Sequence, residues 1–136
     1  MKVAIVGSRR RNTLRDRKIV LDLVTRLVTE SSEDRIVIVS GGCPKGADSF
    51  AEEAARVHRL DKIIFPVAKY PEIKSRHEFR ERAFARNLLV AKEADVIYAL
   101  VHPDRKGGTE NTVQHAHRLG KKVYLVNLIG QAYLSP

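Results

Sequence analysis

KVAIVGSRRRN, residues 2–12, decides the fold of this chain. Its apolar residues, Val3–Val6, run on without alternating with polar ones and end at Gly7, where a basic loop begins. Such an unbroken run, rich in β-branched residues, is typical of a strand that is buried on both faces of a parallel sheet. Similar runs follow along the chain at Ile36–Val39, Lys62–Phe65, Asp95–Leu100 and Lys122–Val126. The sequence therefore predicts five buried strands.

Segments with the apolar spacing of a helix lie between these runs. They span Leu14–Thr29, Ala47–Leu60, Arg76–Ala94 and Thr109–Leu119. The alternation of strands and helices with short connections indicates repeated βαβ units, which have right-handed crossovers and build a parallel sheet. We therefore expect one α/β domain over residues 1–129. Residues 130–136 are expected to form a tail that packs on the surface or frays.

The composition fits one such domain. The chain has 136 residues, 43% hydrophobic and 30% charged, and its apolar runs fall well short of the roughly 20 residues that span a bilayer. The start runs directly into the first predicted strand without a signal-peptide pattern, and Cys43 is the only cysteine, so we expect a cytoplasmic protein without a membrane partner. Lysine and arginine outnumber acidic residues by 25 to 16, which favours an anionic partner, although a solubilising surface explains the same surplus.

Three of the loops that follow strands carry unusual residues. The carboxyl ends of parallel strands meet at one edge of the sheet, and ligands bind there at the point where the strand order reverses. Glycines let the backbone approach a ligand, and a loop that enters a helix points free N–H groups at an anion. One such loop alone is more simply a tight turn. Together the loops predict phosphate and ribose binding through Gly7, Ser8 and Arg9, through Ser40, Gly41, Gly42, Lys45, Gly46 and Asp48, and through Gly107, Gly108 and Thr109.

Several residues near this edge leave alternatives open. Asp48 accepts hydrogen bonds from a ribose or serves as an ordinary acid in the first turn of a helix. Arg10, Arg11 and Arg15 belong to a solvated helix face or to a nucleic-acid footprint, although no aromatic residue interrupts the run for base stacking. The histidines lack ligand spacing, so we expect no metal site, and no cofactor is required. The fingerprints GxGxxG and GxxxxGK[ST] are absent, so the phosphate cradle is of another type.

Five motifs in their order resemble the SLOG superfamily. They are VAIVGSRR from Val3, SGGCPKGADSFAEEAA from Ser40, FPVAKYP from Phe65, the pair Arg86-Asn87 ahead of EADVIYAL, and GGTENTVQHAHRLGKKVYLV from Gly107. The superfamily includes the Lonely Guy phosphoribohydrolases and the DNA-processing protein A family, and the chain is most similar to its small YspA-like branch, over about residues 2–126. The resemblance implies a Rossmann-like three-layer α/β/α fold with a mostly parallel five-stranded sheet. It also implies glycine loops that bind, sense or process a nucleotide or a nucleotide-derived ligand.

The resemblance further implies roles for Arg86, Asn87 and Glu110. Lonely Guy enzymes release a base from a nucleoside monophosphate, and their arginine ahead of strand four has its counterpart in Arg86. Their final glutamate would fall at Thr112, whereas the acid here is Glu110, and two residues on a helix turn a side chain by about 200°. Three hypotheses follow: a nucleotide-binding or nucleotide-sensing domain, an N-glycosidase with Arg86 and Glu110 as catalytic residues, and a DNA-binding module. Relatives often dimerise, but no residue of the sequence assigns an interface.

Overall fold

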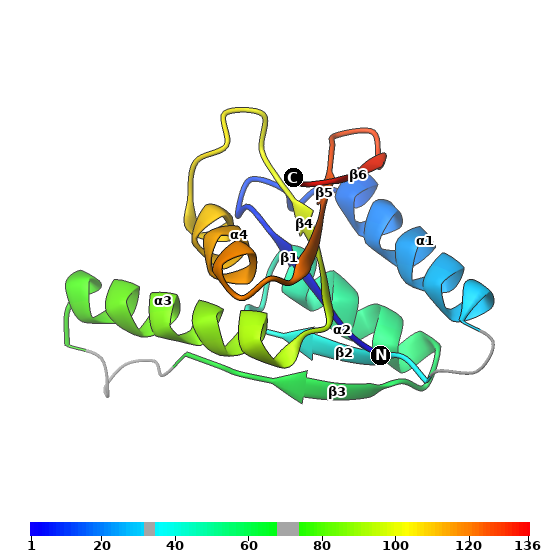
Figure 1. The fold of residues 1–136 in the computed structure, drawn as a ribbon, viewed down its shortest axis with the longest axis horizontal. Helices are drawn as coiled ribbons and strands as arrows, with labels where there is room; N and C mark the ends of the chain where they lie inside the picture. The colour runs from blue at the N-terminus through cyan, green and yellow to red at the C-terminus, as the bar shows by residue number, and fades with distance from the viewer. Residues whose placement is uncertain (32–34, 68–73) are drawn as a thin grey trace.

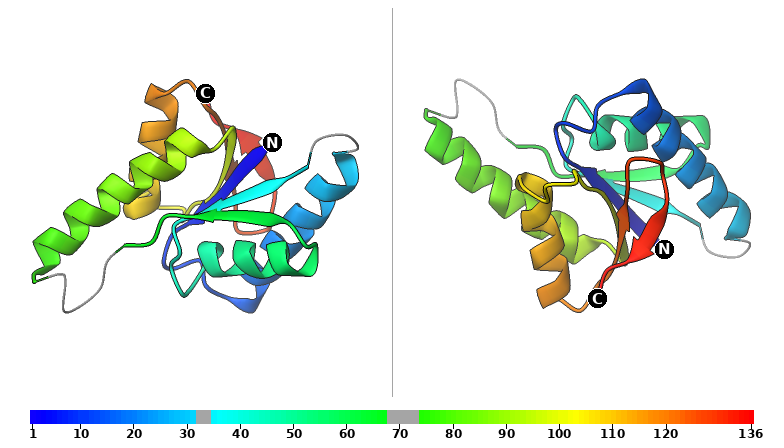
Figure 2. Two further views of the ribbon diagram at one scale, coloured as in Figure 1. Left: turned by 90° about the horizontal axis from the view of Figure 1, so that it is seen from below. Right: turned by 90° about the horizontal axis from the view of Figure 1, so that it is seen from above.

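A computed structural model of the chain describes residues 1–31, 35–67 and 74–136, which form an α/β fold of three layers (Figure 1). Helices α1 and α2 pack on one face of the sheet and α3 and α4 on the other, as two views at right angles show (Figure 2). The helices are α1 (Leu14–Glu30), α2 (Ala47–Val57), α3 (Arg76–Glu93) and α4 (Gly108–Arg118). The strands are β1 (Lys2–Gly7), β2 (Val37–Ser40), β3 (Asp61–Ile64), β4 (Val96–Leu100), β5 (Lys122–Val126) and β6 (Ala132–Leu134). The predicted Rossmann-like α/β class is confirmed.

The sheet has the strand order β3-β2-β1-β4-β5-β6. Strands β1 to β5 are parallel, and Val3 of β1 pairs with Ile38 of β2 on one side and with Val96 of β4 on the other. The chain moves outward from β1 to β3, crosses the sheet through α3, and then moves outward again from β4. The strand order therefore reverses between β1 and β4, which is the point where ligands bind in sheets of this order.

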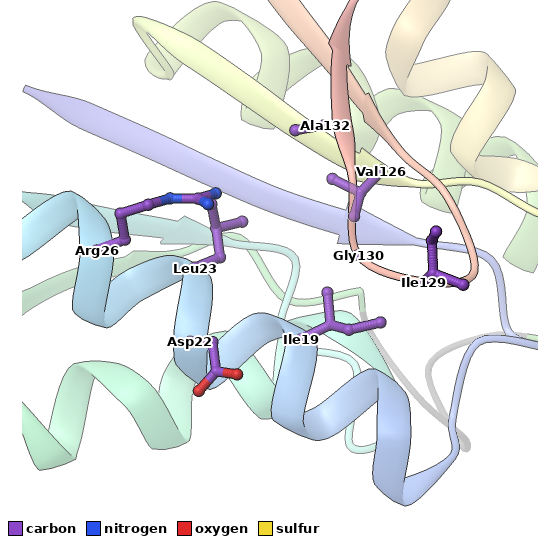
Figure 3. Close-up of a pocket in the computed structure, with 8 residues that line it drawn as sticks. All are labelled: Ile19, Asp22, Leu23, Arg26, Val126, Ile129, Gly130 and Ala132. Atoms are coloured by element: carbon purple, nitrogen blue, oxygen red, sulfur yellow. The ribbon is translucent and has the colours of Figure 1, made fainter.

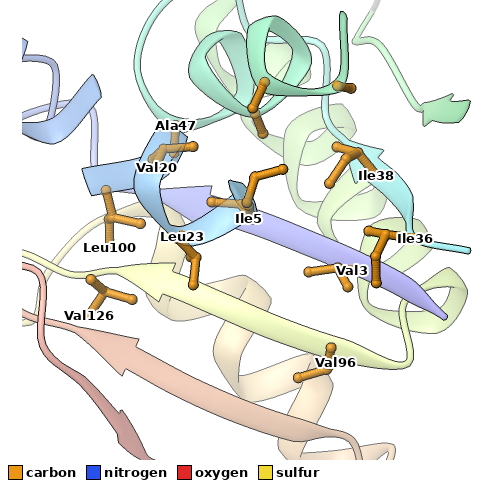
Figure 4. Packing of buried hydrophobic residues seen from close by; sticks show 14 residues of the cluster. Val3, Ile5, Val20, Leu23, Ile36, Ile38, Ala47, Val96, Leu100 and Val126 are labelled. Atoms are coloured by element: carbon orange, nitrogen blue, oxygen red, sulfur yellow. The ribbon is translucent and has the colours of Figure 1, made fainter. Parts of the chain in front are cut away.

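Strand β1 lies in the middle of the fold, and its side chains alternate between two apolar cores. Val3 and Ile5 pack with residues of α1 and α2 (Figure 4), whereas Ala4 and Val6 pack with residues of α3 and α4. All four side chains are buried, as the unbroken apolar run predicts. Burial of a valine or isoleucine side chain contributes about 1.5–3 kcal/mol. This packing fixes the strand ends, and with them the loops that carry the predicted site.

Two predictions about the sheet are wrong. Strand β3 is not buried on both faces, because it is an edge strand and three of its four residues are exposed. Residues 130–136 do not form a tail, because Ala132–Leu134 pairs antiparallel with β5 and gives the sheet six strands in place of five. Asn127 folds the chain back, since its side-chain oxygen accepts the N–H groups of Ile129 at 3.1 Å and Gln131 at 2.9 Å.

Helix α2 ends earlier than predicted, at Val57 instead of Leu60. Arg59 has a φ of 55°, and the N–H of Leu60 donates to the oxygen of Ala55 at 2.8 Å, so the last predicted turn is a tight reversal into β3. Among the residues that the structure describes, none of the helices combines the length and the apolar character that crossing a membrane requires.

Candidate functional site

The first predicted loop is built for packing. A side chain on Gly7 would meet the Cβ of Ala47 at 2.8 Å, so this glycine lets the first residue of α2 pack against the end of β1. Ser8 is buried, and its N–H donates to the oxygen of Leu100 at 3.0 Å, which ties the ends of β1 and β4 together. Gly7 and Ser8 therefore hold β1, β4 and α2 together at the point where the strand order reverses. Any ligand contact at this loop would come from exposed side chains.

Arg11 closes the N-terminus of α1. The side chain is 1% exposed, and its Nε donates to Asp16 at 2.7 Å. Asp16 also forms a capping box with Thr13, so the first turn of α1 is filled by the chain's own carboxylate. Burial alone would raise the pKa of Asp16, but the hydrogen bonds from Arg11 and Thr13 outweigh burial and hold the pKa below its ordinary value. The other guanidinium nitrogens donate at 2.9–3.0 Å to the carbonyl oxygens of Val101, Val126 and Asn127.

The prediction that Arg11 lies on a solvated face or in a nucleic-acid footprint is therefore wrong. Arg11 directs four of its five N–H donors to Asp16 and three carbonyl oxygens, and its side chain is too deeply buried to reach a phosphate on the surface. The N-terminus of α1 is also unsuited to bind the pyrophosphate of a dinucleotide. The backbone amides and the helix dipole that would attract pyrophosphate already face the carboxylate of Asp16.

The second predicted loop uses its amide groups internally. Ser40 is fully buried at the end of β2 and its hydroxyl donates to Glu52 at 2.8 Å. Gly42 and Gly46, the N-cap of α2, adopt φ values of 72° and 75°, which an L side chain rarely adopts. Three backbone N–H groups of the loop have side-chain acceptors: Gly42 donates to Ser40 at 3.0 Å, Cys43 to Asp48 at 3.1 Å, and Gly46 to Asn12 at 2.8 Å. These amides are therefore not free for an anion.

Arg86 of α3 joins this loop across the sheet edge. Its Nη1 donates to the oxygen of Gly41, and its Nε donates to Asn87 at 3.1 Å. A side chain on Gly41 would collide with the guanidinium of Arg86 and would lie 3.0 Å from a carboxylate oxygen of Asp48. Gly41 is therefore the point where Arg86 and Asp48 approach each other. The Nη2 group of Arg86 has no partner among the residues that the structure describes.

Asp48 lies in the first turn of α2, beside this contact. Burial raises its pKa above the ordinary value, although the hydrogen bond from the N–H of Cys43 and the charge of Arg86 act in the opposite direction. Asp48 and Glu52 are one helical turn apart on α2, so two carboxyl groups face the end of β2. The arrangement provides a carboxyl that holds a proton more readily than usual beside an arginine with a free donor.

The third predicted loop is open. Gly107 is the N-cap of α4 with a φ of 116° and no side-chain cap, and a Cβ on either Gly107 or Gly108 would meet no atom within 4 Å. In the described part of the chain, the N–H groups of Gly107, Gly108 and Thr109 have no acceptor. Thr109 is only 8% exposed, and its hydroxyl also lacks a partner there. Three amides and a hydroxyl therefore converge on free space at the positive end of α4.

Asn87 links the third loop to the second. Its side-chain amide donates to the oxygen of Gly108 at 3.4 Å and to Asn111 of α4 at 3.1 Å. Its own oxygen accepts the Nε of Arg86, so the pair Arg86-Asn87 runs from Gly41 to the N-terminus of α4. The structure thus brings the predicted residues of the second and third loops together through one dipeptide of α3.

Glu110, the predicted acid, is held away from this arrangement. Both of its carboxylate oxygens accept hydrogen bonds from Arg105, at 2.8 and 3.0 Å. A bidentate pair of this kind fixes the carboxylate against Arg105 and orients it toward that guanidinium. By contrast, the predicted phosphate contacts Arg9 and Lys45 are exposed and have no partner in the described ranges, so both are free to bind at the rim.

Several contacts at this edge were not predicted. Arg10 and Asp104 form a bidentate pair at 2.6 and 2.7 Å that ties the first loop to the loop after β4. Arg10 holds the pKa of Asp104 well below its usual range. No local pattern joins residues 94 apart in the chain. Glu52 could have been found from its spacing of four from Asp48 on a predicted helix.

A pocket of about 210 Å³ lies elsewhere, between α1 and the turn before β6. Ile19 points toward Val126 and Ile129 across it (Figure 3), and none of the predicted site residues lines it. Because none of the three glycine loops reaches this pocket, we place the candidate site at the open N-terminus of α4. Within residues 1–31, 35–67 and 74–136, no group of three or more histidine, cysteine or acidic side chains is placed to hold a metal ion. Residues 68–71 of the FPVAKYP motif lie outside the described residues.

Comparisons of the chain with protein-family models, with curated proteins and with solved structures found no match.

Proposed function

We propose that the chain binds a phosphate-bearing nucleotide or nucleotide-derived ligand, with a phosphate at the N-terminus of α4. The observation that carries this proposal is the set of unpaired donors in this described segment, namely the amides of Gly107, Gly108 and Thr109 and the hydroxyl of Thr109. Unpaired donors at a helix N-terminus favour an anion through both hydrogen bonds and the helix dipole.

The surroundings support a ligand larger than a free phosphate. Asn87 contacts the loop of Gly108, and next to it the guanidinium of Arg86 and the carboxyl of Asp48 approach each other at Gly41. An arginine donor and a carboxyl acceptor suit a second phosphate and a ribose hydroxyl, respectively. Exposed Lys45 adds positive charge at the rim. The backbone amides and the side chain of Asn87 would orient the ligand, and the net charge of +9 would speed the approach of an anionic ligand.

A thermal-shift and calorimetry screen tests the proposal with AMP, GMP, CMP, ADP-ribose, NAD and cyclic nucleotides. A ligand at a hundredfold excess over Kd stabilises the folded state by about 2.7 kcal/mol. Gly108→Val should abolish binding and keep the fold, because the new side chain enters free space where the phosphate would lie. Gln114→Val, on the exposed surface of the same helix, adds the same side chain and should bind normally. Undiminished binding by Gly108→Val would refute the site.

A second candidate function is cleavage of an N-glycosidic bond, and one observation favours it in a modified form. The carboxyl with a raised pKa beside Arg86, the arginine that the resemblance singles out, is Asp48 and not Glu110. A carboxyl whose pKa is raised by burial releases its proton less readily to water and suits a general acid for a leaving base. Release of free base from AMP, GMP or CMP should then be lost in Asp48→Asn and retained in Glu110→Gln. No release by the unmodified chain would eliminate this candidate.

The DNA-binding hypothesis has less support. Arg11 is buried and Arg10 is paired with Asp104, which leaves Arg9 and Arg15 of the basic run without partners in the described part of the chain. Phosphate contacts by such a surface would make binding fall steeply with salt. Titration of a short DNA at two salt concentrations separates this hypothesis from nucleotide binding.

A further inference from the structure

Helix α3 extends beyond the sheet at the edge that carries the candidate site. Figures 1 and 2 show its N-terminal half projecting past the carboxyl ends of the strands. Its buried residues, Val90 and Ala91, lie near its C-terminus, and Asn87 contacts Gly108 and Asn111 at the N-terminus of α4. The turns of α3 that precede Asn87 therefore lie beyond the sheet, next to the open N-terminus of α4.

Two arginines in these turns have no partner among the described residues. Four further charged side chains pair within the helix, His77 with Glu81 at 2.9 Å and Arg82 with Glu78 at 3.1 Å. Arg76 and Arg80 are exposed, and they precede Asn87 by 11 and 7 residues, which is about three and two helical turns. They therefore lie on the side of α3 that contacts α4, where their charge attracts an anionic ligand.

Phe79 lies on the face of α3 that packs on the sheet farther along the helix. It precedes Val90 by 11 residues, about three turns, so the two side chains project in nearly the same direction. Val90 is 2% exposed in the core, whereas Phe79 is 37% exposed and packs against neither of the two apolar cores that the described residues form. An aromatic ring thus projects from the inner side of α3 beyond the end of the sheet.

The distance between Phe79 and the phosphate site suits the base of a nucleotide. Phe79 precedes Asn87, which contacts the loop of Gly108, by eight residues, or about 12 Å along the helix. A free phosphate at α4 does not reach so far, whereas the ribose of a nucleotide holds the base away from the phosphate. Ala83, which lies between Phe79 and Asn87 along this side of the helix, takes little space.

We propose that Phe79 binds the base of a purine nucleotide, whose ring stacks on the phenyl ring while the phosphate lies at the N-terminus of α4. This inference rests on the proposed nucleotide binding and names the class of ligand. Every base has a flat face that stacks on an aromatic side chain, and a purine offers a larger face than a pyrimidine. The exposed ring of Phe79 gains burial from the base, and Arg76, one turn away, adds positive charge beside it.

Calorimetry of the full chain with AMP, CMP and ribose 5-phosphate tests the assignment. AMP should bind more tightly than CMP, and CMP more tightly than ribose 5-phosphate. Phe79→Ala should weaken AMP binding by at least about fivefold and leave ribose 5-phosphate unchanged, whereas Phe79→Tyr should bind AMP normally. Phe84→Ala is the matched control: Phe84 is 40% exposed on the same helix but lies about 140° around it from Phe79, and its loss should change neither affinity.

This inference and the proposed function fail in different ways. Equal affinities for AMP and ribose 5-phosphate, or undiminished AMP binding by Phe79→Ala, would leave the phosphate site in place and overturn base stacking. If none of the three probes binds, the nucleotide site fails and this inference fails with it. If Phe79→Ala does not fold by circular dichroism, nuclear Overhauser effects in the unmodified chain decide. Contacts between the ring protons of Phe79 and the base protons of bound AMP are expected, and bound AMP without them would contradict the assignment.

Discussion

The N-termini of α2 and α4 look alike in the sequence and differ in the structure. Each helix begins after a glycine N-cap with a positive φ and without a side-chain cap, at Gly46 and at Gly107. At α2 the chain's own side chains occupy the backbone groups of the preceding loop. Ser40 and Asp48 accept the N–H groups of Gly42 and Cys43, and Arg86 donates to the carbonyl oxygen of Gly41. At α4 the amides face open space.

The difference comes from the second residue of each helix. In α2 this residue is Asp48, whose carboxylate turns back and accepts the N–H of Cys43. In α4 it is Thr109, a neutral residue whose hydroxyl has no partner in the described part of the chain. A glycine-rich loop before a helix thus keeps its amides open only when the chain does not supply its own anion. The number of glycines predicts an anion site equally in both loops. Only the neighbouring side chains show which loop has free amides.

The largest expected effect is a difference in stability between the same glycine-to-valine substitution made in each of the two loops. Gly41→Val forces Arg86 to withdraw from the oxygen of Gly41 and crowds Asp48, which should lower the free energy of unfolding by about 2–3 kcal/mol. Gly108→Val meets open space and should cost less than about 1 kcal/mol. Urea unfolding followed by circular dichroism measures both. Equal losses would contradict the distinction between a filled loop and an open one.

A double-mutant cycle sharpens the same contrast. Arg86→Met leaves the oxygen of Gly41 without its partner and should cost about 1–2 kcal/mol. Because Gly41→Val acts through Arg86, the two losses should be clearly less than additive. Gln114→Val, on the exposed surface of α4 and without a partner in common with Arg86 in the described part of the chain, should be additive with Arg86→Met within about 0.5 kcal/mol. Additive losses for the Gly41 pair would mean that the two residues do not act together.

The pH dependence of stability should reveal Asp48. Its folded pKa is raised above the ordinary 3.8, so the folded state holds the proton more tightly than the unfolded chain does. The stability that this bound proton contributes falls as pH rises from the unfolded pKa through the folded pKa. Above both pKa values the folded state carries the full cost of a buried ionised carboxylate. Asp48→Asn removes the penalty, so its stability relative to the unmodified chain should increase as pH rises above 3.8. Urea unfolding across this range measures the trend, and an opposite trend would contradict the raised pKa.

The smallest expected effect on stability concerns Glu110. Glu110→Gln breaks a partly exposed ion pair with Arg105 and should change the free energy of unfolding by less than about 1 kcal/mol. The loss of a negative charge beside the open N-terminus of α4 should strengthen phosphate binding by about two- to fivefold. Calorimetry with the nucleotide from the screen measures this gain. Glu78→Gln, in the first turn of the capped helix α3, is the control and should leave affinity unchanged.

The fold was largely predictable because its strands are unbroken apolar runs. The central position of β1, with Val3 and Ile5 on one face and Ala4 and Val6 on the other, follows from such a run with no polar residue. Strand β6 escaped prediction because three residues are too few to show a pattern, and its pairing depends on the side chain of Asn127. The exposure of β3 depends on its place at an edge, and local sequence does not encode that place.

The residues of the candidate site were predictable and most of their partners were not. Three glycine loops follow strands, so the parallel topology alone brings them to one edge. Which backbone groups remain free depends on distant contacts: Asn12 accepts the N–H of Gly46 from 34 residues away, and Arg86 donates to the oxygen of Gly41 from 45 residues away. The burial of Arg11 could not be predicted, because the sequence places it directly after two arginines that are exposed, Arg9 and Arg10. Only the fold distinguishes it from them.

The closed N-terminus of α1 has a practical use in sorting uncharacterised sequences. Its elements are Arg11, Thr13 and Asp16, which read as R-x-T-x-x-D shortly after the first strand. In dinucleotide-binding sheets of the same strand order, the same corner carries GxGxxG and receives pyrophosphate. A search for which of the two strings follows strand one would divide such chains into those whose first helix has an open N-terminus and those whose first helix is closed by their own side chains.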